Sequence, residues 1–358
     1  MPKTILHFIV DLGRGGAEMM LVKVIRQLPE FRHLLVTLEA NNQFVNEMEG
    51  IQWICLNKKH SLFSIPAATK QLRKIIKEQK PDLVHSHLPL CNFIARLGTP
   101  KSIPLITTIH TSISTAKDYK KWYIRFLDKH TFRFRDSSLI AVSQIVLDQY
   151  KLLLKINPKT SEVIHSFVDT DQFLKKPIAE TGNIFKVITT GSLRQPKNHI
   201  YLLEAFAFLK NHNIELHIYG EGPLKEDLQK RIDEEKLPVI LKGNTTDVAA
   251  ILPQYDLYCM SSLTEGFSVS VLEAMAVQLP LLLSDIPSFR EQAAECALYF
   301  DLADPKDFVS KILLLKKNAG LRNDLAQKGN ERVNENFTLN HHLQKIRRVY
   351  KTVLQENE

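Results

Sequence analysis

Two glutamates stand eight positions apart in the segment 265–276, which has the sequence EGFSVSVLEAMA. Carboxylates accept hydrogen bonds from hydroxyl groups, and the amides that begin a helix bind phosphate oxygens. If a helix begins near Ser268, its first amides face the same site as Glu265 and Glu273. By spacing alone, Glu265 is equally well explained as an acid that stabilises this helix through its dipole.

A second loop that could do chemistry is GSLRQPKN at 191–198, between an apolar run and an amphipathic segment. Arg194 and Lys197 would lie beside a helix N-terminus at the end of a strand, where two cations can neutralise a diphosphate. A solvent-facing loop can carry the same two residues without binding anything. The loop alone therefore does not establish a phosphate site.

Glycines at 13, 15 and 16 follow the first apolar run of the chain. Glycines at this place leave backbone amides open to a phosphate, and Glu39 ends the second run where a dinucleotide-binding fold needs an acid. Glu18, however, occupies the position of the third glycine in that fingerprint. The pattern does not by itself identify a dinucleotide site.

Thirteen short runs rich in Val, Ile and Leu recur with amphipathic stretches between them. This alternation predicts βαβ units and parallel sheets buried on both faces. The runs form two sets, which predicts two doubly wound α/β domains, and two such sheets facing each other would enclose a cleft. The predicted strands are 4–10, 33–39, 51–56, 83–87, 104–110, 138–143 and 161–166, then 185–191, 215–220, 238–243, 257–262, 280–285 and 297–300.

The segment 168–183 has no apolar period and contains Pro177 and Gly182, so we predict an interdomain linker there. The predicted domains are then 1–167 and 184–336. Residues 337–358 follow as a helix that can pack back on the N-terminal domain, with apolar residues at spacings of three and four.

The composition is that of an ordinary globular protein, with 24% charged and 44% hydrophobic residues among 358. Basic side chains exceed acidic ones by eight, and the excess lies in residues 1–174, which hold 24 basic and 15 acidic side chains. Four cysteines without metal-site spacing predict a reducing compartment. No apolar run is long enough to span a membrane, and the first eleven residues predict a strand and not a signal peptide.

The densest basic stretch, 120–135, is predicted to be a helix with Trp122, Phe126, His130 and Phe134 four residues apart. Basic residues beside an aromatic stripe suit a helix that lies on an anionic membrane surface. In the alternative interpretation, the stripe packs on the sheet and the basic residues face water. No nucleic-acid-binding motif accompanies the charge, so we expect no nucleic acid partner.

The block from Gly191 to Glu273 resembles the retaining glycosyltransferases of family four. It contains G-x-L-x-x-x-K-N at 191–198, I-x-G-x-G-P at 218–223 and E-G-F-x-x-x-x-L-E-A-M-A at 265–276. Shorter matches are 15–18 to the family's G-G-x-E and 168–169 to its N-G-[VI]-D. The resemblance implies the GT-B architecture, in which two Rossmann-like domains face each other and the N-terminal one lies on the acceptor side.

The resemblance also implies roles for individual residues. Glu273 would bind the ribose of the nucleotide, Glu265 would face the transferred sugar, and Lys197 would hold the diphosphate and help it to leave, with Arg194 beside it. From the N-terminal domain, Gly16 would approach the diphosphate and His110 would contact the donor sugar. The base would lie along the loop that ends at Asn244, and the amides that hold sugar and phosphate oxygens would be those of Gly266, Phe267, Ser268, Val269, Ser270 and Val271. The catalytic residues would be Glu265, Lys197 and His110.

Two motifs depart from the family pattern. Ser192 stands where the family usually has an arginine, and Arg194 can replace that arginine only if the segment directs both side chains the same way. Ser166 and Phe167 replace the family's Asn-Gly, so acceptor contacts cannot be transferred to this chain.

Asp169, Thr170 and Asp171 form a D-x-D, which in the other large glycosyltransferase fold holds a divalent metal. The place of this triplet in the predicted linker argues against a metal site, and cations of the protein can stabilise a diphosphate instead. We therefore expect no metal and no other cofactor, the nucleotide sugar being a substrate.

Together these observations predict a retaining glycosyltransferase. Its donor would be a nucleotide diphosphate sugar, with UDP the commonest carrier in the family, and its acceptor a lipid-linked or envelope polysaccharide. We expect it in the cytoplasm, on the inner face of the membrane if 120–135 binds lipid. Two alternatives stay open: a nucleotide-sugar epimerase of the same architecture, and a non-catalytic glycan-binding protein that keeps the fold.

Overall fold

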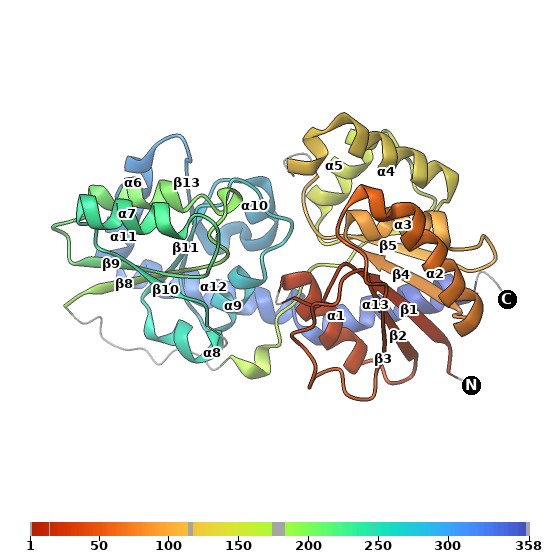
Figure 1. The fold of residues 1–358 in the computed structure, drawn as a ribbon. Helices are drawn as coiled ribbons and strands as arrows, with labels where there is room; N and C mark the ends of the chain where they lie inside the picture. The colour runs from red at the N-terminus through yellow and green to blue at the C-terminus, as the bar shows by residue number, and fades with distance from the viewer. Residues whose placement is uncertain (1, 14, 114–116, 174–182, 246, 356–358) are drawn as a thin grey trace. The chain divides into compact units, whose positions relative to one another are not determined.

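The computed structural model describes residues 2–13, 15–113, 117–173, 183–245 and 247–355. The chain divides into two compact units, one made of residues 1–166 with 340–358 and the other of residues 167–339 (Figure 1). The first unit therefore contains both ends of the chain, and the helix that ends the chain packs within it.

The first unit is built on a seven-stranded parallel sheet in the order β3-β2-β1-β4-β5-β6-β7. The two central strands are buried along their whole length, as expected for apolar runs covered by helices on both faces. The strands are β1 (Thr4–Ile9), β2 (Arg32–Thr37), β3 (Gln52–Cys55), β4 (Leu83–His87), β5 (Leu105–Ile109), β6 (Ser138–Ala141) and β7 (Ser161–Val163).

Helices cover both faces of this sheet. On one face, α2, α3, α4 and α5 lie side by side in this order, each packed against the next. On the other face, α1 and α13 line a common cavity. Their bounds are α1 (Gly16–Arg26), α2 (Ile65–Gln79), α3 (Pro89–Gly98), α4 (Trp122–Phe134), α5 (Gln144–Leu154) and α13 (Leu339–Gln355), with 3₁₀ turns η1 (Leu62–Ser64) and η2 (Lys117–Lys120).

The second unit repeats this plan with a six-stranded parallel sheet in the order β10-β9-β8-β11-β12-β13. Its strands are β8 (Phe185–Thr190), β9 (Ile214–Tyr219), β10 (Val239–Gly243), β11 (Leu257–Met260), β12 (Leu281–Ser284) and β13 (Ala297–Phe300). Its helices are α6 (His199–Ala207), α7 (Lys225–Glu235), α8 (Val248–Ile251), α9 (Val269–Ala276), α10 (Pro287–Ala293), α11 (Pro305–Lys317) and α12 (Ala319–Asn336), with 3₁₀ turns η3 (Thr170–Gln172), η4 (Gln195–Lys197), η5 (Leu252–Gln254) and η6 (Ala294–Cys296).

Each sheet reverses its direction of winding once, between β1 and β4 in the first unit and between β8 and β11 in the second. Connections leave such a point in opposite directions, and open α/β sheets bind ligands in the crevice that results. The glycine loop 13–16 follows β1 and the Lys197 loop follows β8. The Glu265 loop follows β11, so all three loops that the sequence singles out begin at the switch points.

The predicted fold class is confirmed, because all thirteen predicted strands are present in two doubly wound α/β units. Since α13 belongs to the first unit, charge is divided more unequally than along the sequence. The first unit carries 28 basic and 15 acidic side chains, a net of +13, and the second carries 19 and 24, a net of −5. Among the described residues, no helix has both the length and the apolar character needed to cross a membrane.

A buried ion pair fixes α4 to its neighbours in the first unit. Arg96 on α3 donates through Nη1 to Asp128 Oδ1 on α4 at 2.5 Å, and both side chains are at most 1% exposed. Tyr119 Oη donates to Oδ2 at 2.5 Å and Tyr150 Oη, from α5, to Oδ1 at 2.7 Å. The carboxylate thus has three donors, so a charge can stay on it in the interior.

Replacing Asp128 with alanine should destabilise the first unit by about 3–5 kcal/mol, because Arg96 would keep its charge without a counter-ion. Both tryptophans of the chain, Trp53 and Trp122, belong to this unit, so urea unfolding followed by tryptophan fluorescence reports on it. Asp148→Ala, at an exposed position of α5, should change the free energy of unfolding by less than about 0.5 kcal/mol. Equal stabilities of the two variants would contradict the role assigned to the ion pair.

Candidate active site

The centre of the candidate site is an ion pair between Lys197 and Glu265. Lys197 Nζ lies 2.7 Å from Glu265 Oε1, and Ser262 Oγ donates to the same oxygen at 2.7 Å. Lys197 follows β8 and Glu265 follows β11, and these two strands are neighbours in the sheet. Their side chains are 22% and 13% exposed, so the pair is accessible to a ligand and still partly shielded from water.

Contacts between the two loops hold Lys197 in place. Ser261 Oγ donates to the carbonyls of Lys197 and Asn198 at 3.1 and 2.9 Å, and Leu263 N–H donates to Pro196 O at 2.9 Å. Asn198 caps α6 with a φ of 52°, a left-handed conformation that asparagine tolerates better than most residues. The cation is therefore positioned by backbone contacts and not only by its own carboxylate partner.

Two glycines of the turn 218–223 let it pack directly on the phosphate loop. A Cβ at Gly220 would lie 1.9 Å from Gly191 O, and one at Gly222 would lie 2.5 Å from Leu193 O. Hydrogen bonds join the same segments, from Gly191 N–H to Tyr219 O at 2.9 Å and from Leu193 N–H to the carbonyl of residue 221 at 3.0 Å. Any larger residue at 220 or 222 would force these loops apart.

Helix α9 supplies the amides that the sequence predicts near Glu265. It begins at Val269 with Ser268 as N-cap, and Ser268 is tied to Gln292 by a pair of hydrogen bonds of 3.0 and 2.7 Å. The amide of Ser268 is thus engaged, whereas the next three amides have no acceptor within the helix. Glu273 lies half-buried on α9. Tyr258 is buried near this carboxylate, and its own burial together with the charge of Glu273 raises the pKa of the Tyr258 phenol.

Ser192, Arg194 and Asn244 are exposed. Arg194 N–H donates to Ser192 O at 2.8 Å, which closes a tight turn. The segment is therefore not extended, and Arg194 does not share the face of a strand with Ser192. The guanidinium of Arg194 makes no hydrogen bond or ion pair with any residue that the structure describes.

In the first unit, Gly16 begins α1 directly after the glycine loop, of which Arg14 lies outside the described residues. The side chain of Glu18 turns back over this first turn, and a Cβ at Gly15 would lie 2.2 Å from its Oε2. Burial, together with the charge of Asp11, raises the pKa of Glu18. An anion that binds at Gly16 would have to share the amides of α1 with this carboxylate.

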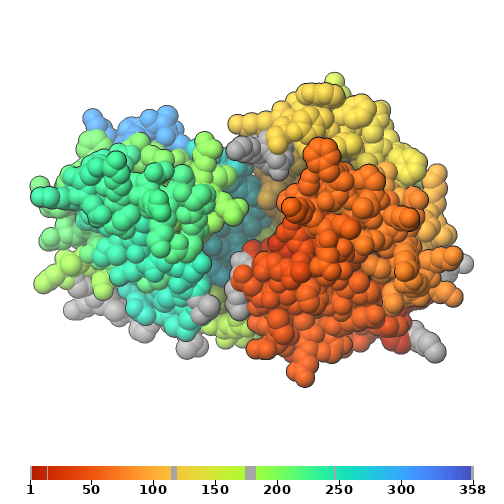
Figure 2. Space-filling view, in the orientation of Figure 1, coloured from red at the N-terminus to blue at the C-terminus, as the bar shows by residue number. Residues whose placement is uncertain are grey.

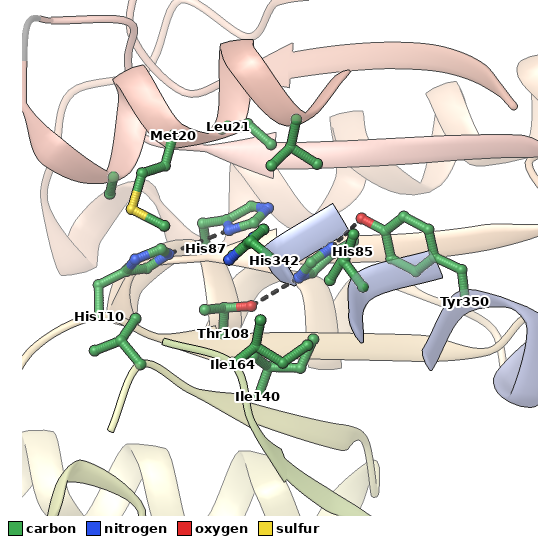
Figure 3. A pocket seen from close by; sticks show the side chains of 14 residues that line it. Met20, Leu21, His85, His87, Thr108, His110, Ile140, Ile164, His342 and Tyr350 are labelled. Carbon is green, nitrogen blue, oxygen red and sulfur yellow. Dashed lines mark hydrogen bonds between the residues drawn. The ribbon is translucent and has the colours of Figure 1, made fainter. Parts of the chain in front are cut away.

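His110 follows β5 and joins a cluster of buried histidines (Figure 3). Its Nε2 lies 3.2 Å from His87 Nδ1. Burial, with the neighbouring His342, lowers the pKa of His110 to about 4. The ring is therefore neutral at pH 7, so it can exchange a hydrogen bond with a ligand but brings no positive charge to the site.

The cluster lines a cavity of about 40 Å³ between the sheet, α1 and α13. His85 in its wall is hydrogen-bonded to Tyr350 Oη and to Thr108 Oγ1, both at 2.7 Å. Burial lowers the pKa values of His7, His85 and His87 well below their ordinary value, and the mutual proximity of these rings adds to the effect. The interior of the first unit therefore contains neutral imidazoles at its switch point.

His7, His85 and His87 form the only group of three potential metal ligands found within the described residues, with ligand atoms within 4.8 Å of one another. The group contains no carboxylate or thiolate. Both ring nitrogens of His85 are already hydrogen-bonded, Nδ1 with Tyr350 Oη and Nε2 with Thr108 Oγ1, so these contacts contribute to the packing of the first unit.

The structure thus brings Lys197, Glu265 and the start of α9 together in the second unit, whereas Gly16 and His110 belong to the first. Sequence reasoning missed Ser262, Gln292 and the buried histidines. The alternation LVHSH places two imidazoles on one face of a strand, a signal that could have been used. Ser262 and Gln292 carry no comparable signal, because their roles depend on the course of the loops.

Two family models match this chain. Residues 14–172 match the family model described as Glycosyltransferase Family 4, and residues 170–332 match the one described as Glycosyl transferases group 1. The two models together span residues 14–332, which leaves α13 of the first unit outside both. The chain belongs to the family-four glycosyltransferases.

Individual relatives are distant in sequence. The UDP-Gal:alpha-D-GlcNAc-diphosphoundecaprenol alpha-1,3-galactosyltransferase of Escherichia coli is 26% identical over 60% of this chain and 60% of that protein. The O-antigen biosynthesis glycosyltransferase WclY, also of Escherichia coli, is 22% identical over 98% of this chain and 99% of that protein. The structure of Anabaena Alr3699/HepE in complex with UDP and glucose superposes with a TM-score of 0.84 at 16% identity, covering 97% and 99% of the two chains. The likeness confirms that the fold is GT-B.

The histidine cluster should make the first unit sensitive to acid. Its histidines are neutral when folded but become protonated near pH 6.5 when unfolded, so the unfolded state binds more protons below that pH. Stability should therefore be constant above about pH 7 and fall as the pH drops from 6.5 towards 4. Each such histidine contributes a slope of up to about 1.4 kcal/mol per pH unit.

Urea unfolding followed by tryptophan fluorescence across this pH range measures the effect. His87→Gln should reduce the slope, while His60→Gln, at an exposed position, should leave it unchanged. A free energy of unfolding that stays level between pH 7 and pH 5 would contradict the assignment.

Proposed function

We propose that this glycosyltransferase transfers a hexosyl or N-acetylhexosaminyl group from UDP to a lipid-linked or envelope polysaccharide acceptor, with retention of anomeric configuration. The observation that carries the proposal is the Lys197–Glu265 ion pair at the switch point of the second sheet, beside the amides that begin α9. A cation and helix amides converge there, as binding of a diphosphate requires.

The leaving diphosphate gains negative charge as the bond to the anomeric carbon breaks. In this proposal Lys197 and the first amides of α9 stabilise that charge. In the front-face route that we favour, the acceptor oxygen bonds to the same face of the sugar, and its proton passes to the departing phosphate oxygen. His110 is assigned to the donor sugar and Asn244 to the base.

Glu265 is less suited to a double displacement through a covalent intermediate. The ion pair with Lys197 and the hydrogen bond from Ser262 both stabilise its negative charge. A carboxylate stabilised in this way is a weaker nucleophile. We therefore assign Glu265 to positioning Lys197 and contacting the sugar, and Glu273 to the ribose hydroxyls.

The choice of UDP rests on relatives. The Anabaena structure contains UDP and glucose, and the name of the Escherichia coli galactosyltransferase specifies a UDP-linked donor. No metal is needed in this proposal, because protein cations and helix amides take over the neutralisation of the diphosphate. Addition of EDTA should therefore leave turnover unchanged.

The proposed acceptor is anionic. The first unit carries a net charge of +13, which attracts phosphate-bearing molecules. The name of the Escherichia coli galactosyltransferase gives its acceptor as a sugar on diphosphoundecaprenol, a lipid diphosphate. The four cysteines of the chain are all free, in keeping with a cytoplasmic protein at the inner face of the membrane.

Turnover assays with UDP-glucose, UDP-galactose and their N-acetylated counterparts test the proposal. Lys197→Ala should lower kcat by about 10²–10³-fold, the usual loss when one donor to a developing charge is removed. Glu273→Ala should raise the donor KM by about tenfold or more. Lys230→Ala, at an exposed position of the same unit, is the control and should match the unaltered protein.

The alternatives give different results in the same assay. An epimerase would convert the donor sugar without an acceptor, whereas a transferase would show at most slow hydrolysis. A glycan-binding protein would bind acceptor and turn over no donor. An inverted anomer in the first-formed product, read by NMR, would contradict retention.

Arg194 offers a separate prediction about the phosphate loop. If it replaces the family arginine missing at position 192, Arg194→Ala should lower kcat by about tenfold or more, since a charged hydrogen-bond partner is lost. Adding Ser192→Arg to that variant should then restore part of the rate. Unchanged kinetics in Arg194→Ala would show that Lys197 and the amides suffice.

A further inference from the structure

Helix α4 presents large aromatic side chains to solvent. Trp122 is 71% exposed, Phe126 52% and Phe134 62%, and Tyr123 is exposed beside them. The aromatic stripe therefore does not pack on the sheet, and that interpretation of 120–135 is wrong. The α4 segment lies at the surface of the first unit in the space-filling view (Figure 2, yellow).

The inner face of α4 explains why the stripe points outward. Its buried residues are Ile124, Asp128, Thr131 and Phe132, which lie opposite the stripe at 100° per residue. Asp128 is bound to Arg96 and to two tyrosines in the interior. Turning the helix to bury the aromatic rings would pull this carboxylate out of its ion pair, so the orientation is fixed.

The exposed rings form a continuous strip along the helix. The ring centroids of Trp122 and Phe126 are 6.4 Å apart, and those of Phe126 and His130 are 4.0 Å apart. The strip is thus a preformed apolar ridge. Because its rings already contact one another, docking of the ridge on a surface costs little side-chain entropy.

Cations border the ridge. Arg125, Lys129 and Arg133 follow one another along the helix at spacings of four, next to the aromatic strip. No carboxylate in the described part of the chain forms an ion pair with any of the three. Charge and aromatic surface therefore occur together on one helix face without an intramolecular partner for the charges.

We propose that this face of α4 docks on an anionic lipid bilayer. The aromatic rings would enter the boundary between headgroups and acyl chains, and the three cations would contact lipid phosphates. A second copy of the chain is a poor occupant, because pairing this face with itself would bring two rows of cations together in a unit that already carries +13. The docking helix does not depend on the donor or on the chemistry of the second unit.

The experiment is sedimentation of the full chain with vesicles, one set of phosphatidylcholine alone and one of equal parts phosphatidylcholine and phosphatidylglycerol. We expect strong binding to the anionic set only, weakening as salt is raised. In a Trp53→Phe background, the fluorescence of Trp122 should shift to the blue on binding. Equal binding to both sets, or none to either, would overturn the proposal.

Two variants with matched controls locate the contact on α4. Changing Arg125, Lys129 and Arg133 together to glutamine should weaken binding to anionic vesicles about a hundredfold, because each cation near the membrane surface strengthens binding about fivefold. The control removes the same charge from the exposed lysines of α2, a helix of the same unit without aromatic residues: Lys70, Lys74 and Lys77 to glutamine. Similar losses in both triple variants would mean general attraction of the basic unit and would overturn docking by α4.

The aromatic contribution is tested by Trp122→Ala with Phe126→Ala, which should weaken binding about tenfold or more. Phe63→Ala, at a 97% exposed ring elsewhere in the unit, should have no effect. If the double variant instead converts a dimer into a monomer in sedimentation equilibrium, the ridge is a self-association surface and the proposal fails. Hydrolysis of the donor by the same variants should be unchanged, which separates failure of docking from failure of the proposed reaction.

Discussion

The ion pair between Lys197 and Glu265 is the interaction on which the geometry of the candidate site depends. It joins the loops that follow two neighbouring strands, and those strands are neighbours only because the sheet reverses its winding there. Ser261 and Leu263 fix the backbone on either side of the lysine. The positive charge of Lys197 and the negative charge of Glu265 cancel, so in the proposed reaction a diphosphate would compete with Glu265 for the lysine. Donor binding and release of this lysine from its carboxylate would then be linked.

The two units differ in the sign of their net charge and in where that charge lies. The second unit is acidic overall, and in the proposed reaction one positioned lysine and a helix N-terminus attract the anionic donor. The first unit is strongly basic at its surface, yet burial keeps the histidines at its switch point neutral. The histidine cluster thus brings no positive charge to the switch point, whereas the basic side chains at the surface can act on large anionic molecules.

Much of the fold could be predicted from the sequence, because apolar runs of strand length alternate with amphipathic segments and the period of each is local. The site was predictable only in part. The resemblance located Lys197 and Glu265, but their contact spans 68 residues and depends on sheet order. The outward aromatic face of α4 was not decidable from helical periodicity, since an aromatic stripe normally marks the buried side. A buried Asp128 reverses that rule here, and its partner Arg96 lies on another helix with no sequence signal for the pairing.

The course of the chain has a consequence for separating the two units. Helix α13 covers the histidine face of the first sheet, where Tyr350 bonds to His85 across 265 residues of sequence, and the whole second unit lies between these two residues in the chain. A fragment that stops before α13 keeps all seven strands of the first sheet but leaves its apolar and imidazole-lined face open to water. The second unit can therefore be cut out as one continuous segment of chain, whereas the first cannot.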